Sequence, residues 1–249
     1  FSTKFKYFFV PLVVAYTYFI VVVSMNYVRQ SVSISLIFLG IAFLLNKNNI
    51  KFIICLFLAS LFHKTAAVFV VLLPLFYITK IYFSKIVSLI YILFSLIFIT
   101  FILYLSSISE SNIYVSQGEI SSAGAVFRSM FHVVPVFLYI YFRNFFKKQY
   151  SDSILILDYI LLLVVYCFVL SFLFSTLSDR FNLYLIFFDI LVYAKLCEKL
   201  SLFARNLIFL YLFLFYSVVF YIWFNWGEWA EYGWLPYKNY IYEFLLNTF

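Results

Sequence analysis

The sequence predicts an all-α polytopic integral membrane protein, and two features lead to this class. Hydrophobic residues make up 67% of the 249 residues and charged residues only 11%, a balance that a water-soluble domain could not place on its surface. The apolar runs are continuous, whereas the strands of a transmembrane barrel alternate apolar and polar residues over about 10 positions. Because lipid offers the backbone no hydrogen-bonding partners, these continuous runs predict helices.

Nine apolar stretches follow one another along the chain. They lie at residues 7–24, 31–45, 52–62, 65–79, 86–105, 127–142, 154–174, 181–194 and 206–224. The ambiguous region is 52–78, which His63 and Lys64 interrupt near its centre. Either this region crosses the membrane once and holds a charge near mid-bilayer, or the chain reverses at His63 between two short helices.

The distribution of Lys and Arg over the loops decides between these alternatives. If the chain reverses at His63, most of the basic residues lie on the side of the N-terminus; if it does not, the bias disappears and Lys64 is left in lipid. Basic loops face the cytoplasm, so we expect about nine transmembrane helices, including a short hairpin that turns outside at His63. The N-terminus of the chain is then cytoplasmic and its tail lies outside.

We expect one transmembrane domain over residues 1–249, without repeats or internal boundaries. Residues 106–126 form a long, Ser-rich and acidic outer loop, which is either a mobile lid or a disordered linker. Residues 225–249 form an aromatic outer tail. Because the sequence begins at Phe1 with no initiator Met, we also expect a fragment that lacks N-terminal spans.

The few basic and ionisable residues on the predicted outer side lie at helix ends. They are Arg29 in NYVRQS, His63 and Lys64 in LFHKTA, Arg128 and His132 in VFRSMFH, and Asp179 and Arg180 in LSDRFNLY. An arginine fork pairs with phosphate oxygens through parallel hydrogen bonds and keeps its charge, so the set suits a lipid-linked diphosphate. The alternative is that each is an ordinary interfacial residue that reaches toward headgroups or pairs locally.

Three further features each allow two interpretations. His132 follows Arg128 by four residues on the same helix face, and it either serves the site or is a buried, hydrogen-bonded histidine. Asp158 and Asp189 lie within apolar runs, where carboxylates are often functional, but Asp189 could equally pair with Lys195 or a tyrosine. The tryptophans of the tail either stack on sugar rings or form an aromatic belt at the lipid interface.

The same sequence argues against several classes of protein. The basic residues are scattered over the loops and form no patch for nucleic acid. Cys55, Cys167 and Cys197 have neither disulfide nor metal-ligand spacing. The sequence shows no carboxylate pair for a divalent metal, no phosphate-binding glycine loop and no nucleophile elbow. We therefore expect no metal and no cofactor, and a reaction whose energy is stored in a lipid-linked substrate.

Three segments resemble a known family. They are the run from Asn26 to Tyr77, in which Arg-Gln opens one span and a Phe-His turn joins two short ones, SDRFNLYL (Ser178 to Leu185) and WLPYKNYI (Trp234 to Ile241). They resemble the EpsG/Wzy-type polysaccharide polymerases of bacteria, which implies a GT-C-like fold. Such polymerases usually carry further N-terminal spans and an outer Asp-Tyr-rich segment, so the resemblance also implies that part of the site is missing here.

The resemblance implies a metal-independent membrane glycosyltransferase that polymerises O-antigen (lipopolysaccharide), capsule or exopolysaccharide. Its substrates would be oligosaccharide repeat units on a polyprenyl carrier such as undecaprenyl diphosphate, at the outer face of the bacterial cytoplasmic (inner) membrane. Besides these lipid-linked oligosaccharides, the expected partners are the bilayer and a chain-length regulator protein. The alternatives are an O-antigen ligase, a flippase for lipid-linked oligosaccharide and a polysaccharide acyltransferase.

For the polymerase reaction, roles can be assigned to the ionisable residues and to the tail. The diphosphate-binding group is expected to comprise Arg29, Arg128 and Arg180, with Lys64 as an auxiliary cation. His63 is the first choice for the base or acceptor-positioning residue, and Asp179 is the second. The glycan-contacting group is expected to comprise His132, Trp229, Trp234 and Tyr237.

Overall fold

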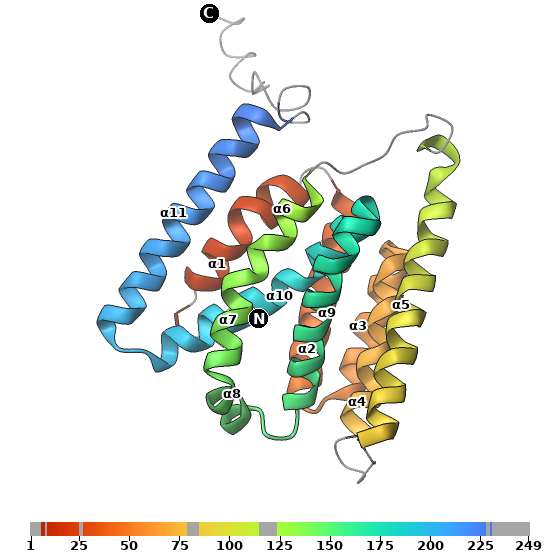
Figure 1. Ribbon diagram of the computed structural model, residues 1–249, viewed down its shortest axis with the longest axis horizontal. Helices are drawn as coiled ribbons and strands as arrows, with labels where there is room; N and C mark the ends of the chain where they lie inside the picture. The colour runs from red at the N-terminus through yellow and green to blue at the C-terminus, as the bar shows by residue number, and fades with distance from the viewer. Residues whose placement is uncertain are drawn as a thin grey trace, which may run out of the picture.

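A computed structural model describes residues 6–7, 9–24, 27–78, 85–114, 124–227 and 230 of the chain, and all the regular structure within them is helical (Figure 1). In chain order the elements are α1 (Phe9–Ala15), the π-helix η2 (Tyr16–Ser24), α2 (Val28–Leu45), α3 (Asn49–Phe62), the 3₁₀-helix η3 (Lys64–Val71), α4 (Leu72–Ile78), α5 (Lys85–Tyr114), α6 (Ala125–Ser129), the 3₁₀-helix η5 (Met130–His132), α7 (Val133–Tyr141), α8 (Arg143–Gln149), α9 (Ile154–Leu173), α10 (Ser175–Lys199) and α11 (Leu202–Trp226).

The predicted all-α membrane class is confirmed. Fewer of the described helices are long and apolar enough to span a membrane than the nine predicted. Among the described residues, four helices are long and apolar enough to cross a membrane: α2, α9, α11 and the Val87–Leu105 part of α5. A fifth is obtained if Ala125–Tyr141 and Arg143–Gln149, which meet at a bend of 74°, count as one span. The other predicted stretches are helical but short, as in α3, or interrupted by charges, as in α10.

The chain reverses at His63, as the distribution of basic residues predicts. α3 ends at Phe62, His63 has an extended backbone (φ −150°, ψ 119°) and η3 begins at Lys64. The two short helices pack against each other (Figure 1). At the start of this hairpin the Asn48 side chain accepts a hydrogen bond from the backbone N–H of Lys51 and caps α3.

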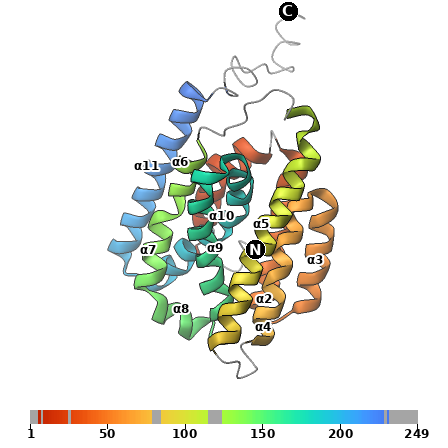
Figure 2. The same ribbon diagram turned by 45° about the vertical axis from the view of Figure 1, so that its right-hand side comes forward.

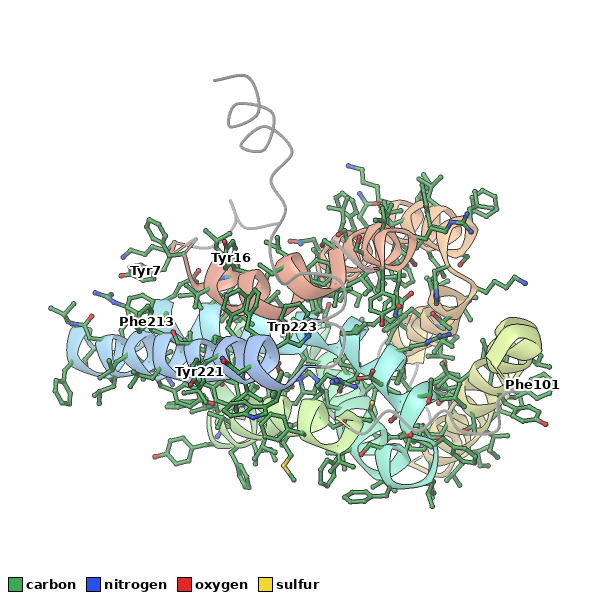
Figure 3. All side chains as sticks on the ribbon, turned by 90° about the horizontal axis from the view of Figure 1, so that it is seen from above. Tyr7, Tyr16, Phe101, Phe213, Tyr221 and Trp223 are labelled. Atoms are coloured by element: carbon green, nitrogen blue, oxygen red, sulfur yellow. The ribbon has the colours of Figure 1, made fainter. Side chains whose placement is uncertain are left out.

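α10 lies at the centre of the molecule and packs against α1, α2, α6, α7, α9 and α11 (Figure 2). Most of its residues are buried, including the large side chains of Phe181, Phe187 and Phe188. α5 and α11, in contrast, expose most of their apolar side chains, as lipid-facing helices do. Viewed from above, Phe101 of α5 and Phe213 of α11 lie at opposite edges of the molecule (Figure 3).

Two predicted boundaries differ from the structure. α5 continues to Tyr114, so the first part of the predicted outer loop 106–126 is helical; residues 115–123 of that loop lie outside the described residues. α11 continues to Trp226, and most of the predicted tail 225–249 also lies outside the described residues. Helix hydrogen bonds form within the backbone, so α5 can continue through the polar residues that follow its apolar segment.

Gly40 allows α2 and α3 to approach closely. A Cβ at this position would lie 3.1 Å from Cys55 Cβ and 3.2 Å from a ring carbon of Phe52. We expect Gly40→Leu to destabilise the protein by about 1–3 kcal/mol, because the added side chain overlaps both neighbours. A lower thermal unfolding midpoint in detergent would check this. Ser35→Leu, at an exposed position of the same helix, is the control, and an equal effect of both variants would contradict the close-packing role of Gly40.

Candidate functional site

Four helix ends meet at one end of the bundle and carry most of the predicted site residues. They are the start of α2 with Arg29, the α3–η3 turn with His63 and Lys64, the short helix α6 with Arg128 in its last turn, and the start of α10 with Asp179 and Arg180. In Figure 1 this is the upper end, where α5 also ends. The alternating direction of the helices brings these separate segments together.

His63 begins a chain of hydrogen bonds that runs into the bundle. Its Nδ1 lies 2.5 Å from Thr65 Oγ1, and Thr65 Oγ1 lies 3.1 Å from the hydroxyl of Tyr184. The Tyr184 hydroxyl lies 3.2 Å from Ser33 Oγ, which donates to the carbonyl oxygen of Ala59 at 3.0 Å. Three side chains of this network, from Ser33, Thr65 and Tyr184, are buried, whereas His63 is half-buried at its open end.

The direction of donation along this chain can be deduced from its last member. A carbonyl oxygen only accepts, so the Ser33 proton goes to Ala59 and Ser33 must accept from Tyr184. Tyr184 then accepts from Thr65, and Thr65 accepts from His63 Nδ1–H. With one proton on each oxygen, this is the arrangement in which every hydroxyl both donates and accepts. It assigns the proton of neutral His63 to Nδ1 and the lone pair to Nε2.

The surroundings of His63 favour its neutral form. Burial lowers the pKa of His63 from 6.5 to about 4, and the positive charge of Arg180 acts in the same direction. Arg180 is itself held in place, because the Gln30 side chain donates a hydrogen bond of 3.1 Å to its backbone carbonyl. A neutral imidazole and a guanidinium therefore lie near each other at this end of the bundle.

A charged pair lies beside Arg180, at the preceding residue of α10. Nε of Arg128 donates a hydrogen bond to Asp179, and each side chain retains 22% of its exposure. This pair ties the start of α6 to the start of α10. It also offsets the charge of Asp179, so Asp179 stands in a different environment from His63.

The predicted cations differ in their partners. Arg180 lies near His63, and Arg128 binds Asp179. Arg29 and Lys64 are exposed at the same end, and the described part of the chain gives them no hydrogen-bonding or ion-pairing partner. Trp229, Trp234 and Tyr237, predicted to contact glycan, lie outside the described residues.

His132 is buried and hydrogen-bonded, which is one of the two alternatives that the sequence left open. It is 1% exposed, its Nδ1 lies 2.8 Å from both carboxylate oxygens of Asp189, and its Nε2 lies 2.8 Å from Oδ1 of Asn182. The Cys167 thiol lies 3.3 Å from the carbonyl oxygen of Ser178 and 3.7 Å from Asn182 Oδ1. Because both ring nitrogens face acceptors, this hydrogen bonding favours the imidazolium and makes the pair with Asp189 ionic.

Both carboxylates in apolar runs, Asp158 and Asp189, have partners that are distant in the sequence. Asp189 binds His132 rather than the nearby Lys195, whose ammonium group binds Glu198 at 2.9 Å. Asp158 accepts two hydrogen bonds from the guanidinium of Arg143 and one from the hydroxyl of Tyr139, at the bend between α7 and α8. Among the residues that the structure describes, no three His, Cys, Asp or Glu side chains are grouped to hold a metal ion.

The sequence model of the EpsG family matches residues 1–239, which is nearly the whole chain. The chain belongs to the EpsG family. No curated protein and no solved structure matches it. EpsG-type polysaccharide polymerases are Wzy-like, so membership indicates a polysaccharide polymerase role in a bacterial membrane.

Two of the segments on which the EpsG resemblance rests contact each other in the structure. Gln30 and Ser33, near the start of the first segment, bond to Arg180 and Tyr184 of SDRFNLYL. Thr65, from the end of the first segment, also bonds to Tyr184. The sequence analysis did not name these partners, because Ser, Thr and Tyr are common throughout this chain and carry no signal by position alone.

The buried pair gives a stability prediction. We expect His132→Ala and Asp189→Ala each to lower the free energy of unfolding by about 3–5 kcal/mol, because each leaves an uncompensated buried charge. The double variant His132→Leu/Asp189→Leu should recover most of the loss. Thermal unfolding in detergent, followed by tryptophan fluorescence, would measure all three.

The control for this experiment is Asp152→Ala, which removes one partner of the exposed pair between Lys47 and Asp152. Exposed pairs contribute little, so its midpoint should stay close to that of the wild type. A double variant no more stable than the single ones would show that packing, not charge, explains the losses.

Proposed function

We propose that this EpsG-family chain polymerises polyprenyl-diphosphate-linked oligosaccharide repeat units by metal-independent glycosyl transfer at the outer face of the bacterial inner membrane. The observation that carries the proposal is the convergence of four helix ends, where His63 lies within hydrogen-bonding distance of Thr65 and Tyr184, and Tyr184 lies one turn after Arg180 on α10. Nine crossings, a cytoplasmic N-terminus and a GT-C-like architecture belong to the same proposal. The bias of basic residues toward the opposite loops supports this orientation.

The chemistry requires one bond to form and one to break at the anomeric carbon of the growing glycan. The hydroxyl oxygen of the incoming repeat unit forms the new bond, and the bond from the anomeric carbon to the diphosphate oxygen breaks. The electron pair leaves with the polyprenyl diphosphate, and the hydroxyl proton passes to Nε2 of His63. The hydrogen-bond chain from Nδ1 to Ala59 holds the imidazole with this nitrogen unprotonated.

Cations must stabilise the negative charge that develops on the diphosphate. We assign this role first to Arg180. Arg128, which binds Asp179 through Nε, contributes a second guanidinium to the clamp. Asp179 then positions Arg128, and we keep it as the second choice for the base. Arg29 and Lys64 are exposed at the same end and complete the clamp as the diphosphate enters.

The base strength of His63 depends on this clamp. In the free protein its pKa is about 4, partly because Arg180 repels a second positive charge. A bound diphosphate offsets the charge of Arg180 and supplies negative charge of its own, so binding raises the pKa of His63 toward its ordinary value. The imidazole becomes a stronger base when the donor is in place.

The glycan itself is assigned to the aromatic tail, in which Trp229, Trp234 and Tyr237 offer flat apolar faces to sugar rings. His132 is not assigned to the glycan, because its ring is buried and bonded on both sides. Its role in the proposal is to hold the helix that carries Arg128. A chain-length regulator protein remains a proposed partner.

The test is a gel of surface polysaccharide from a strain deleted for the gene and complemented with wild type, Arg180→Ala or Arg180→Lys. We expect the ladder to collapse to a single repeat unit on deletion. Wild type should restore it, and both variants should fail because the fork is lost. Lys148→Ala is the matched control and should restore the ladder, because Lys148 is exposed on α8, which is not one of the four segments of the site.

The same gel separates the alternative functions. Loss of even the single repeat unit from the surface on deletion favours a flippase or a ligase. An unchanged ladder would show that the protein does not act in the assembly of this polysaccharide. Loss of an acyltransferase would change the acylation of the polysaccharide but not its chain length. Restoration of the ladder by Arg180→Ala would remove that arginine from the proposed clamp.

The pH dependence of the purified enzyme tests the role of His63. The acid limb of kcat/KM, which reports the free enzyme, should lie near pH 4, and the limb of kcat, which reports the complex, should lie at higher pH. Activity is lost as the pH falls through each value, because a protonated imidazole cannot accept the hydroxyl proton. In Arg180→Gln, NMR titration of the His63 imidazole should give a higher pKa than in the wild type, because the repelling charge is gone. A kcat/KM limb near 6.5 in the wild type would exclude His63 in this environment as the base.

A further inference from the structure

An apolar groove lies between α1 and α11, away from the site described above. Phe9, Val10 and Val13 of α1 and Phe209, Leu212 and Phe213 of α11 line a space of about 330 Å³. Val10 and Leu212 form its floor at 1% exposure each, whereas Phe9 and Phe213 are 60% and 66% exposed and form its rims. Its shape is therefore that of an open channel with a closed floor.

One end of this groove carries basic side chains. Arg205 lies one turn before Phe209 on the same face of α11, and Lys6 lies three residues before Phe9. Tyr7 connects the two parts: its ring contacts Phe209 edge-on with a centroid distance of 6.4 Å, and the guanidinium of Arg205 lies 4.4 Å from the ring and donates to its hydroxyl. Figure 3 shows Tyr7 and Phe213 at the same edge of the molecule.

The charge at this end is positive. The acid beside it, Glu198, accepts from the backbone N–H of Lys6 at 3.1 Å and from the ammonium group of Lys195 at 2.9 Å. Glu198 is thus compensated by Lys195, and the charges of Lys6 and Arg205 remain. A groove for a hydrocarbon chain therefore ends at two cations stacked about one tyrosine ring, with Lys6 Nζ 5.7 Å from its centroid.

We propose that an anionic phospholipid binds here, with one acyl chain in the groove and its phosphate on Arg205 and Lys6. Charge complementarity between a phosphate and this pair, directly at the end of an apolar channel, carries the assignment. The volume lies near the lower limit for small-molecule sites, which suits one chain rather than a whole lipid.

The site is separate from the one that binds the diphosphate in the proposed function. α10 runs from Arg180 at one end to Glu198 at the other, a helical rise of roughly 27 Å. The phosphate of a lipid bound to Lys6 and Arg205, beside Glu198, therefore lies near the opposite membrane surface, where the basic loops are. The inference does not rest on the reaction proposed above and stands or falls by lipid binding alone.

The test is native mass spectrometry of the full chain purified in detergent and titrated with dioleoyl phosphatidylglycerol, dioleoyl phosphatidylcholine or undecaprenyl phosphate. We expect phosphatidylglycerol to bind about 30-fold more tightly than phosphatidylcholine, because each of the two cations contributes about fivefold near a lipid surface. Arg205→Gln should reduce this preference to about fivefold. Val13→Trp should fill the groove and weaken binding of both phospholipids.

Lys148→Ala is the charge-matched control, since it removes an exposed cation of α8 and should leave the preference unchanged. If Arg205→Gln does not fold without its bond to Tyr7, the wild type and Val13→Trp still decide. Equal binding of the two phospholipids, equal effects of Lys148→Ala and Arg205→Gln, or tighter binding of undecaprenyl phosphate that Val13→Trp weakens would each overturn the proposal.

Discussion

A charge buried among apolar side chains requires a partner of opposite charge, and this requirement organises the centre of the molecule. Asp189 lies on α10, and its partner His132 lies on η5, between α6 and α7. Only one axial position of the two helices joins these groups. The same register places Arg128, four residues before His132, beside Asp179, ten residues before Asp189. One buried pair thus sets the second, half-exposed pair.

Helix content and the reversal at His63 could be predicted because they depend on local properties of the sequence. The length of each apolar run and the side on which each Lys and Arg falls are both visible without any tertiary information. The special position of α10 could not be predicted in this way. Its apolar part, 181–194, resembles the other stretches, yet it lies in the middle of the bundle and packs against helices on several sides.

The partners of Asp189 and His63 could not be predicted from the sequence either. Lys195 is six residues from Asp189, whereas His132 is 57 residues away, and only the rotation of α10 about its axis decides which one the carboxylate meets. His63 stands out as one of two histidines in the chain. Its hydroxyl partners do not, since Tyr184 is one of 23 tyrosines. Rare residues are therefore informative in this sequence, and the common ones that hold them are not.

The hydrogen bonds around His63 form a closed ring. The carbonyl of Ala59, which ends the chain through Thr65, Tyr184 and Ser33, also accepts the backbone N–H of His63 at 3.0 Å. α2, α3, η3 and α10 each contribute a member, so the helices cannot shift separately without opening the ring. A displacement of α10 that parted Tyr184 from Thr65 would release the Nδ1 proton from its fixed position. Helix movement would then be transmitted to the lone pair of a single nitrogen.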